Sequence, residues 1–228
     1  MTNKENIVPV NKLKIEMELF LKTYKAQNCV WGKMQGCLGL FQFARYVVQI
    51  NNAIRGDDPY ADWFLIQIQD ALNDGRRVLQ RFENRYKDVL SLKKNQQRII
   101  VSPDKPIKIK VQFVSPYSFI AADMLGDYDR ALSLMEVARL TGIKLDKSIA
   151  DLESELNKTL KSTFNLPKQW KPTQVTRIDV EQDTEKAQQA RNFMGQIPAK
   201  ILNKEVVAQY APTIRGKKPA LSEQLITP

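Results

Sequence analysis

The chain has 228 residues, with 35 Lys and Arg, 25 Asp and Glu and no His, which gives a formal net charge of +10. The absence of His excludes Ser–His and Cys–His nucleophile pairs, an imidazole general base and His-bearing metal sites. A hydrophobic content of 43% is typical of a folded protein. The length suits one large domain or two small ones. The surplus of positive charge favours a polyanionic partner such as nucleic acid, although a basic surface kept for solubility gives the same number.

The predicted elements follow from two periodicities, strict alternation for strands and apolar spacing of three or four for helices. In chain order they are a strand over 13–19, helices over 36–54 and from Pro59 to about Leu92, a polar linker over 93–106, a strand over 107–113, and helices from Pro116 to about Leu140, from Asp146 to about Phe164 and over 185–194. Asp58 and Asp146 are predicted N-caps, and Gly142 is predicted to end its helix at positive φ. Gly75 is unfavourable inside a helix by on the order of 1 kcal/mol relative to Ala.

The predicted fold class is therefore mainly α with a short β-ribbon (α+β). Three regions are expected: an N-terminal strand and helical region over 1–100, a ribbon–helix–helix DNA-binding region over 101–170, and a C-terminal extension over 171–228 with a short helix and a basic, Pro-rich tail. No signal peptide or membrane-spanning stretch is evident, so we expect a cytoplasmic protein without a membrane partner. Cys29 and Cys37 are expected to be reduced and packed, with a disulfide left open.

The segment from Ile107 to Phe164 has the order strand, helix, Gly turn, helix, which is the layout of a ribbon–helix–helix unit. A lone strand leaves its backbone N–H and C=O groups unpaired, and pairing with the same strand of a second copy makes a two-fold dimer. We therefore expect a homodimer. Its dimer ribbon would turn inward the apolar residues Ile107, Ile109, Val111 and Phe113.

The outward row of this strand carries Lys108, Lys110 and Gln112. A two-stranded ribbon fits the major groove, where Lys donates to guanine and Gln pairs with adenine, so these three residues are the predicted base contacts. The predicted phosphate contacts, near the ribbon or the start of the second helix, are Lys105, Lys144, Lys147 and Ser148. A strand with outward lysines is more often simply a solvated edge strand that avoids aggregation.

The strand over 13–19 is the competing ribbon. Its outward row includes Glu16 and Glu18, which DNA phosphates would repel, and it therefore ranks second.

Several motifs spread along the chain carry a resemblance to a known family. They are Asp57-Asp58-Pro59-Tyr60-Ala61-Asp62-Trp63, the stretch from Phe113 to Arg130 with Ser115-Pro116-Tyr117 and Asp127-Tyr128-Asp129-Arg130, Ala138-Arg139 with Gly142, Val175-Thr176-Arg177-Ile178-Asp179, and Ala187-Gln188-Gln189-Ala190-Arg191 with Met194-Gly195. In these, from about Leu13 to Pro198, the chain resembles the AcaB-like family, regulators encoded by conjugative plasmids and integrative conjugative elements. The resemblance implies a ribbon–helix–helix dimer that binds double-stranded promoter DNA and activates transfer genes, with RNA polymerase as a candidate further partner.

The sequence offers two other classes of function, an enzyme and an accessory protein. An enzyme is disfavoured: Asp127 and Asp129, two apart on a helix, point in different directions, and the glycines at 36 and 39 lack the Lys-Ser/Thr of a phosphate loop. We therefore expect no enzymatic activity, no cofactor and no metal site. An accessory DNA-binding or scaffold protein of the conjugation machinery needs the same basic surface, and competition between duplex and single-stranded DNA would separate ribbon reading from base stacking.

Overall fold

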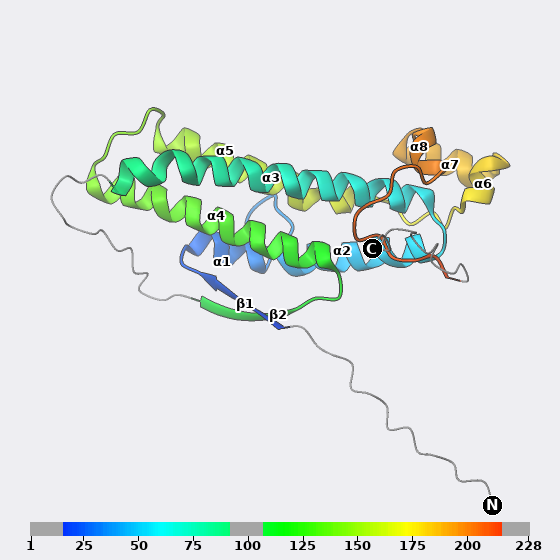
Figure 1. Cartoon of the computed structure of the whole chain (residues 1–228), viewed down its shortest axis with the longest axis horizontal. Coiled ribbons are helices and arrows are strands. Elements are labelled where there is room, and N and C mark those ends of the chain that lie inside the picture. Colours follow the sequence, from blue (N-terminus) through cyan, green and yellow to red (C-terminus); the bar gives the residue numbers. More distant parts are fainter. Residues whose placement is uncertain (1–15, 92–106, 216–228) are drawn as a thin grey trace, which may run out of the picture.

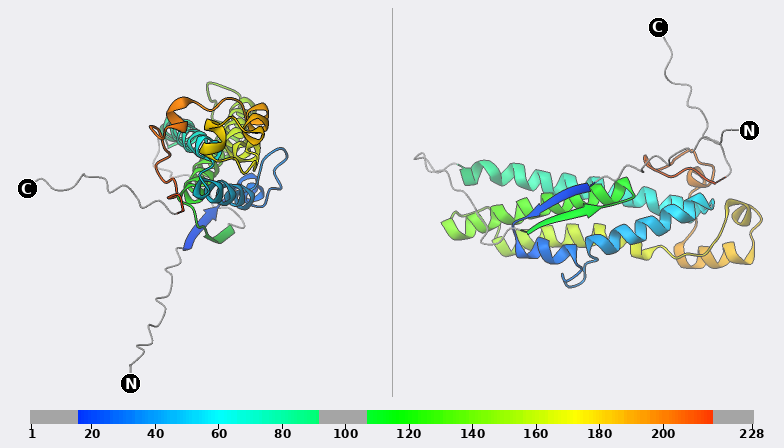
Figure 2. Two further views of the ribbon diagram at one scale, coloured as in Figure 1. Left: turned by 90° about the vertical axis from the view of Figure 1, so that its right-hand side faces the viewer. Right: turned by 90° about the horizontal axis from the view of Figure 1, so that it is seen from below.

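The computed structural model describes residues 16–91 and 107–215 (Figure 1). Its elements in chain order are β1 (Glu16–Leu21), α1 (Tyr24–Val30), α2 (Leu40–Arg55), α3 (Pro59–Ser91), β2 (Ile107–Gln112), α4 (Pro116–Thr141), α5 (Ile149–Asn165), the 3-10 helix η1 (Leu166–Gln169), α6 (Arg177–Glu181), α7 (Glu185–Met194) and α8 (Ala199–Leu202). Helices α2 to α5 form an elongated bundle. The two strands lie along one side of it, and α6 to α8 sit at one end (Figures 1 and 2). The predicted α+β class is confirmed.

Helix α4 is the central element of the bundle. Pro116 occupies its first turn, and Gly142 ends it at φ 67°, as the sequence predicted. Its buried residues lie on nearly every side of the helix, because α1, α2, α3, α5 and β1 all pack against it. A helix that is buried all round has no single apolar stripe to read in the sequence. The described elements of the regions 1–100 and 101–170 thus share one hydrophobic core, while the boundaries drawn between those regions stay a prediction.

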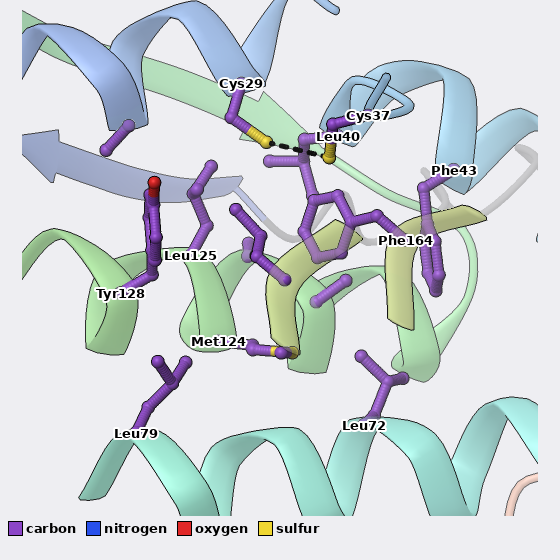
Figure 3. Packing of buried hydrophobic residues seen from close by; sticks show 14 of the residues in the cluster. Cys29, Cys37, Leu40, Phe43, Leu72, Leu79, Met124, Leu125, Tyr128 and Phe164 are labelled. Atoms are coloured by element: carbon purple, nitrogen blue, oxygen red, sulfur yellow. Dashed lines mark hydrogen bonds between the residues drawn. The ribbon is translucent and has the colours of Figure 1, made fainter. Parts of the chain in front are cut away.

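The centre of the bundle explains the unfavourable glycine in α3. A Cβ on Gly75 would lie 2.4 Å from Met124 Cε and 3.1 Å from Thr163 Oγ1, so this glycine permits a close approach of α3 to α4 and α5. Figure 3 shows Leu72 and Leu79 of α3 facing Met124 of α4 across this contact. The cost in helix propensity is therefore offset by packing between helices that lie far apart in the sequence.

Three sequence expectations need correction. Helix α1 was not predicted, and the helix expected over 36–54 begins at Leu40. The N-cap of α5 is Ser148, whose Oγ accepts a hydrogen bond from the Asp151 backbone N–H at 3.1 Å. Asp146 instead accepts from Arg85 and Tyr86 of α3, a pairing that depends on how α3 packs and is invisible in the local sequence. The hydrogen bond from Tyr86 and the nearby Arg85 charge lower the pKa of Asp146.

Candidate nucleic-acid interface

Strands β1 and β2 form an antiparallel ribbon within one chain. Glu16 lies opposite Gln112, Glu18 opposite Lys110, and Phe20 opposite Lys108. The two strands that the sequence offered as competing ribbons therefore pair with each other. The expectation that the strand at Ile107 needs its twin from a second copy is wrong, because β1 of the same chain supplies the backbone partners along that edge. The dimer inferred from this unpaired strand loses that basis.

The inner face of the ribbon packs on the bundle. Leu19, Leu21, Ile109 and Val111 are buried. At the end of β1, the Asp129 carboxylate accepts hydrogen bonds from the backbone N–H groups of Lys22 and Thr23 at 2.9 and 2.7 Å and from the Thr23 hydroxyl at 2.7 Å. These bonds fix the end of β1 to the middle of α4, so the ribbon is held on both its apolar face and one end.

The other two residues of the predicted inward row are half-buried rather than buried. Ile107 begins β2 and packs against the same core cluster. Phe113 follows the last residue of β2, and its ring lies 6.2 Å from Phe41 and 5.4 Å from Phe119 between centroids. The inward row therefore faces the core of its own chain.

The outer face of the ribbon consists of exposed side chains from both strands: Glu16, Glu18, Phe20, Lys108, Lys110 and Gln112. Lys108 Nζ lies 2.7 Å from Glu18 Oε2, and Gln112 donates to the Glu16 carboxylate. This hydrogen bond from Lys108 lowers the pKa of Glu18. Two acids thus balance two lysines, and the face is close to neutral instead of basic. Among the described residues, Lys110 forms no ion pair.

The predicted phosphate contacts lie at the α4–α5 turn, where Lys144, Lys147 and Ser148 are exposed. Lys147 Nζ pairs with Glu155 Oε2 at 3.1 Å, and the Ser148 hydroxyl is engaged as the N-cap of α5. Lys105 lies outside the described residues. These side chains surround the start of α5, as the sequence predicted. The Lys147–Glu155 pair is exposed and therefore weak, so Lys147 can release Glu155 and bind another anion.

The ribbon and the α4–α5 turn do not come together. Helix α4 has 26 residues and is about 39 Å long at 1.5 Å per residue. The ribbon end bound to Asp129 lies near its midpoint, so the turn at Gly142 is about 20 Å further along the helix axis. A first helix of this length separates the predicted base contacts from the predicted phosphate contacts, so the arrangement differs from a compact ribbon–helix–helix unit.

A basic row on α3 was missed in the sequence. Arg77, Arg81 and Arg85 are exposed and four residues apart, which places them on one face of the helix. Arg77 pairs with Asp74, and Arg85 pairs with Asp146. Within the described chain Arg81 has no acidic partner, and its Nε donates to the Arg77 carbonyl at 3.3 Å. The spacing of these three arginines at intervals of four is visible in the sequence and could have predicted a basic face on this helix. Beside this row, Arg81, Arg85 and Lys147 line a hollow whose other lining residues include Val78, Phe82 and Leu152.

Three of the motifs behind the family resemblance meet elsewhere, at the start of α3. The Arg177 guanidinium lies 2.5 Å from Asp57 Oδ1 and 2.5 Å from Asp62 Oδ2, and its Nε donates to the Leu202 carbonyl at 3.0 Å. We call these four residues the Arg177 clamp. Tyr60 donates to the Gly195 carbonyl at 3.2 Å. The three segments 57–63, 175–179 and 194–195, distant in sequence, therefore form one contact.

Asp58 caps α3 beside this clamp, as predicted. Its Oδ1 accepts from the backbone N–H groups of Tyr60 and Ala61 at 2.9 and 3.1 Å, while its Oδ2 is buried and has no partner. Burial raises the pKa of Asp58 to about 6, because desolvation outweighs the two backbone hydrogen bonds. This cluster is a buried structural joint and presents little of its charge to solvent.

Two further observations concern other kinds of site. In residues 16–91 and 107–215, no three His, Cys, Asp or Glu side chains gather as ligands for a metal ion. Asp127 pairs with Arg76 and Arg130, whereas Asp129 binds the end of β1, so the two carboxylates point apart as the helix period predicted. No helix in that part of the chain combines the length and apolarity needed to cross a membrane.

Bundle, ribbon and clamp together define a mainly helical α+β protein with a solvent-facing two-stranded ribbon. A family model described as "Transcriptional regulator AcaB" matches residues 10–215. The chain belongs to the AcaB family of transcriptional regulators. Its fold is similar to the crystal structure of selenomethionine-containing AcaB from uropathogenic E. coli, with a TM-score of 0.56 and 12% sequence identity over 85% of this chain and 97% of that one. A search of curated proteins finds no match.

Proposed function

We propose that this chain binds double-stranded DNA in a sequence-specific way and thereby activates transcription of conjugative transfer genes. The observation that carries the proposal is the ribbon, whose apolar face is held on α4 while its polar side chains stand in solvent. A two-stranded ribbon has the width that the major groove admits. Membership of a transcriptional regulator family supports the same function.

The outer face of the ribbon offers complementary chemistry for base edges. Lys108 and Lys110 suit guanine, Gln112 suits adenine, and the carboxylates of Glu16 and Glu18 suit the amino group of cytosine. Lys110 is the leading base contact, because its ammonium group forms no ion pair within the described chain, whereas Lys108 is paired with Glu18. The near-neutral face is suited to reading bases, and the attraction to phosphate must come from other basic parts of the chain.

Phosphate contacts are assigned to Lys105, Lys144, Lys147 and Ser148, with the arginine row of α3 as an addition that the structure suggests. A homodimer remains part of the proposal on a new basis. Each chain brings a complete ribbon, so a two-fold pair would set two ribbons on two half-sites. RNA polymerase is the proposed protein partner of an activator.

Lys110→Ala tests the ribbon assignment. Against duplexes tiled from the element that encodes the protein, the variant should lose roughly 1–3 kcal/mol of specific binding and relax the preference at one base position. Lys200→Ala, an exposed lysine of α8, is the matched control and should behave as the parent. Equal loss on specific and random duplexes would make Lys110 a phosphate contact and overturn the groove assignment.

Two measurements test the remaining parts of the proposal. Sedimentation at micromolar concentration should show a dimer, and a stable monomer on and off DNA would contradict the two-ribbon arrangement. Sequence-specific binding without any change in transcription from the bound promoters would instead support the accessory role in the conjugation machinery.

A further inference from the structure

Cys29 and Cys37 lie side by side in the core, away from the outer face of the ribbon. Cys29 belongs to α1, and Cys37 precedes α2; their Sγ atoms are 3.8 Å apart (Figure 3). The chain has no other cysteine, so this contact is the only thiol pair that one molecule can form. Both cysteines are free. The sequence alone did not determine whether these cysteines form a disulfide, and the contact between their sulfurs shows that they are close enough to react with each other.

The two thiols differ in how solvent reaches them. Cys29 is fully buried, whereas Cys37 keeps 8% exposure and lines a hollow together with Gly36, Leu38, Lys168 and Lys171. A small reagent entering this hollow therefore meets Cys37 first. Cys29 is not among the residues that line this hollow.

The electrostatic environment gives the two sulfurs different roles. The Cys29 and Cys37 sulfurs are within hydrogen-bond contact of each other, and the Lys161 ammonium lies nearby, 3.8 Å from where a Cβ on Gly36 would sit. The contact with Cys29 and the Lys161 charge lower the pKa of Cys37, while the contact with Cys37 and burial raise the pKa of Cys29. Because the thiolate is the nucleophile, Cys37 is the group that attacks and Cys29 the group that resolves.

We propose that Cys29 and Cys37 form a peroxide-responsive pair that closes to an intramolecular disulfide. The Cys37 thiolate attacks one oxygen of hydrogen peroxide, the O–O bond breaks, and Cys37 becomes a sulfenic acid as the leaving oxygen takes up a proton to form water. The Cys29 sulfur then attacks the Cys37 sulfur, its proton leaves with the hydroxyl as a second water, and the S–S bond forms. Two thiols are oxidised, and one peroxide is reduced to two waters.

Closure requires the sulfurs to approach from 3.8 Å to about 2.05 Å. The segment between the two cysteines can absorb this movement. Gly32 and Gly36 both have φ of 71° and flank a mostly exposed turn between α1 and α2. Glycine adopts many backbone conformations without steric cost, so the backbone can readjust at these two positions more readily than within the helices on either side.

The test uses the full wild-type chain and hydrogen peroxide. The intact mass should fall by two hydrogen atoms, no thiol should titrate after denaturation, and a peptide map should join the peptides of Cys29 and Cys37; dithiothreitol should reverse all three. Persistence of both thiols under conditions that oxidise free cysteine would overturn the proposal. Disulfides that link two chains would overturn it as well.

Trapping variants test the order of attack, with circular dichroism as the check on folding. Cys29→Ser should accumulate a sulfenic acid at Cys37 that dimedone traps, whereas Cys37→Ser should leave Cys29 unmodified. Lys161→Gln should slow disulfide formation several-fold, and Lys158→Gln, an exposed lysine on the same helix, should not. A dimedone adduct on Cys29 would reverse the assigned roles. The wild-type measurement decides the disulfide itself even where a variant fails to fold.

Discussion

The Arg177 clamp and the outer face of the ribbon are both rich in charge, but they use it differently. In the clamp, Arg177 comes from a segment far along the chain from Asp57 and Asp62; Arg177 and Asp62 are buried, and Asp57 is half-buried. On the ribbon, Lys108, Lys110 and their partners stand exposed. Three of the motifs that carry the family resemblance meet at the clamp, and a fourth supplies Asp129, which holds the end of β1, so these motifs serve the fold. The residues proposed to read DNA lie outside those motifs.

Arg177→Ala should distinguish the clamp from the ribbon most strongly, because it should change stability and leave DNA binding unchanged. Removing the guanidinium leaves Asp62 buried without a partner, which should lower the free energy of unfolding by about 3–5 kcal/mol in urea titrations. Arg191→Ala breaks an exposed pair with Asp183 and should change stability by less than about 0.5 kcal/mol. Under conditions where Arg177→Ala is folded, its DNA affinity should equal that of the parent. A small loss of stability would deny the clamp its structural role.

Asp58→Asn should change the pH dependence of stability. The pKa of Asp58 is raised to about 6, so its favourable contribution is complete below the ordinary value of 3.8 and is lost as pH rises through 6. Asn stays neutral throughout. The stability of the variant relative to the parent should therefore increase by about 1–3 kcal/mol between pH 4.5 and 7.5, measured by urea unfolding at both values. A difference that is constant with pH would show that Asp58 does not titrate in this range.

Glu18→Gln changes the outer face of the ribbon. It releases Lys108 and removes a negative charge from the outer face, so binding to random duplex should tighten several-fold and the salt slope should steepen by about one unit. Stability should stay within about 0.5 kcal/mol of the parent, since both side chains are exposed. Glu181→Gln, an exposed acid on α6, is the control. An unchanged salt slope would place the ribbon away from DNA.

Lys147→Ala should have the smallest effect. Loss of one phosphate contact weakens binding to all sequences alike and flattens the salt slope by about one unit. The measurement is a salt titration with specific and random duplexes in parallel. A selective loss on the specific duplex would instead bring the α4–α5 turn close to the bases, against the separation that the length of α4 imposes.

Much of the fold could be predicted from local pattern. Helices α3, α4, α5 and α7 were predicted with ends close to those observed, and the caps at Asp58 and Gly142 were predicted correctly, because an N-cap or a positive-φ stop depends on adjacent residues. Helix α1 was missed because it spans 7 residues, too few for a clear period. The candidate site was predicted only in part. The alternation of both strands was recognised, but their pairing with each other was not predicted.

The sequence by itself determined the helical class, the polar and apolar faces of each strand, the basic character and the resemblance to a regulator family, since each depends on composition or on neighbours along the chain. Only the tertiary structure decided that β1 is the mate of β2, that acids neutralise the ribbon lysines, that Arg177 joins two aspartates and that the two cysteines touch. The physical reason is common to all four. Each contact joins segments whose meeting depends on how the helices pack, and a local period carries no record of that packing.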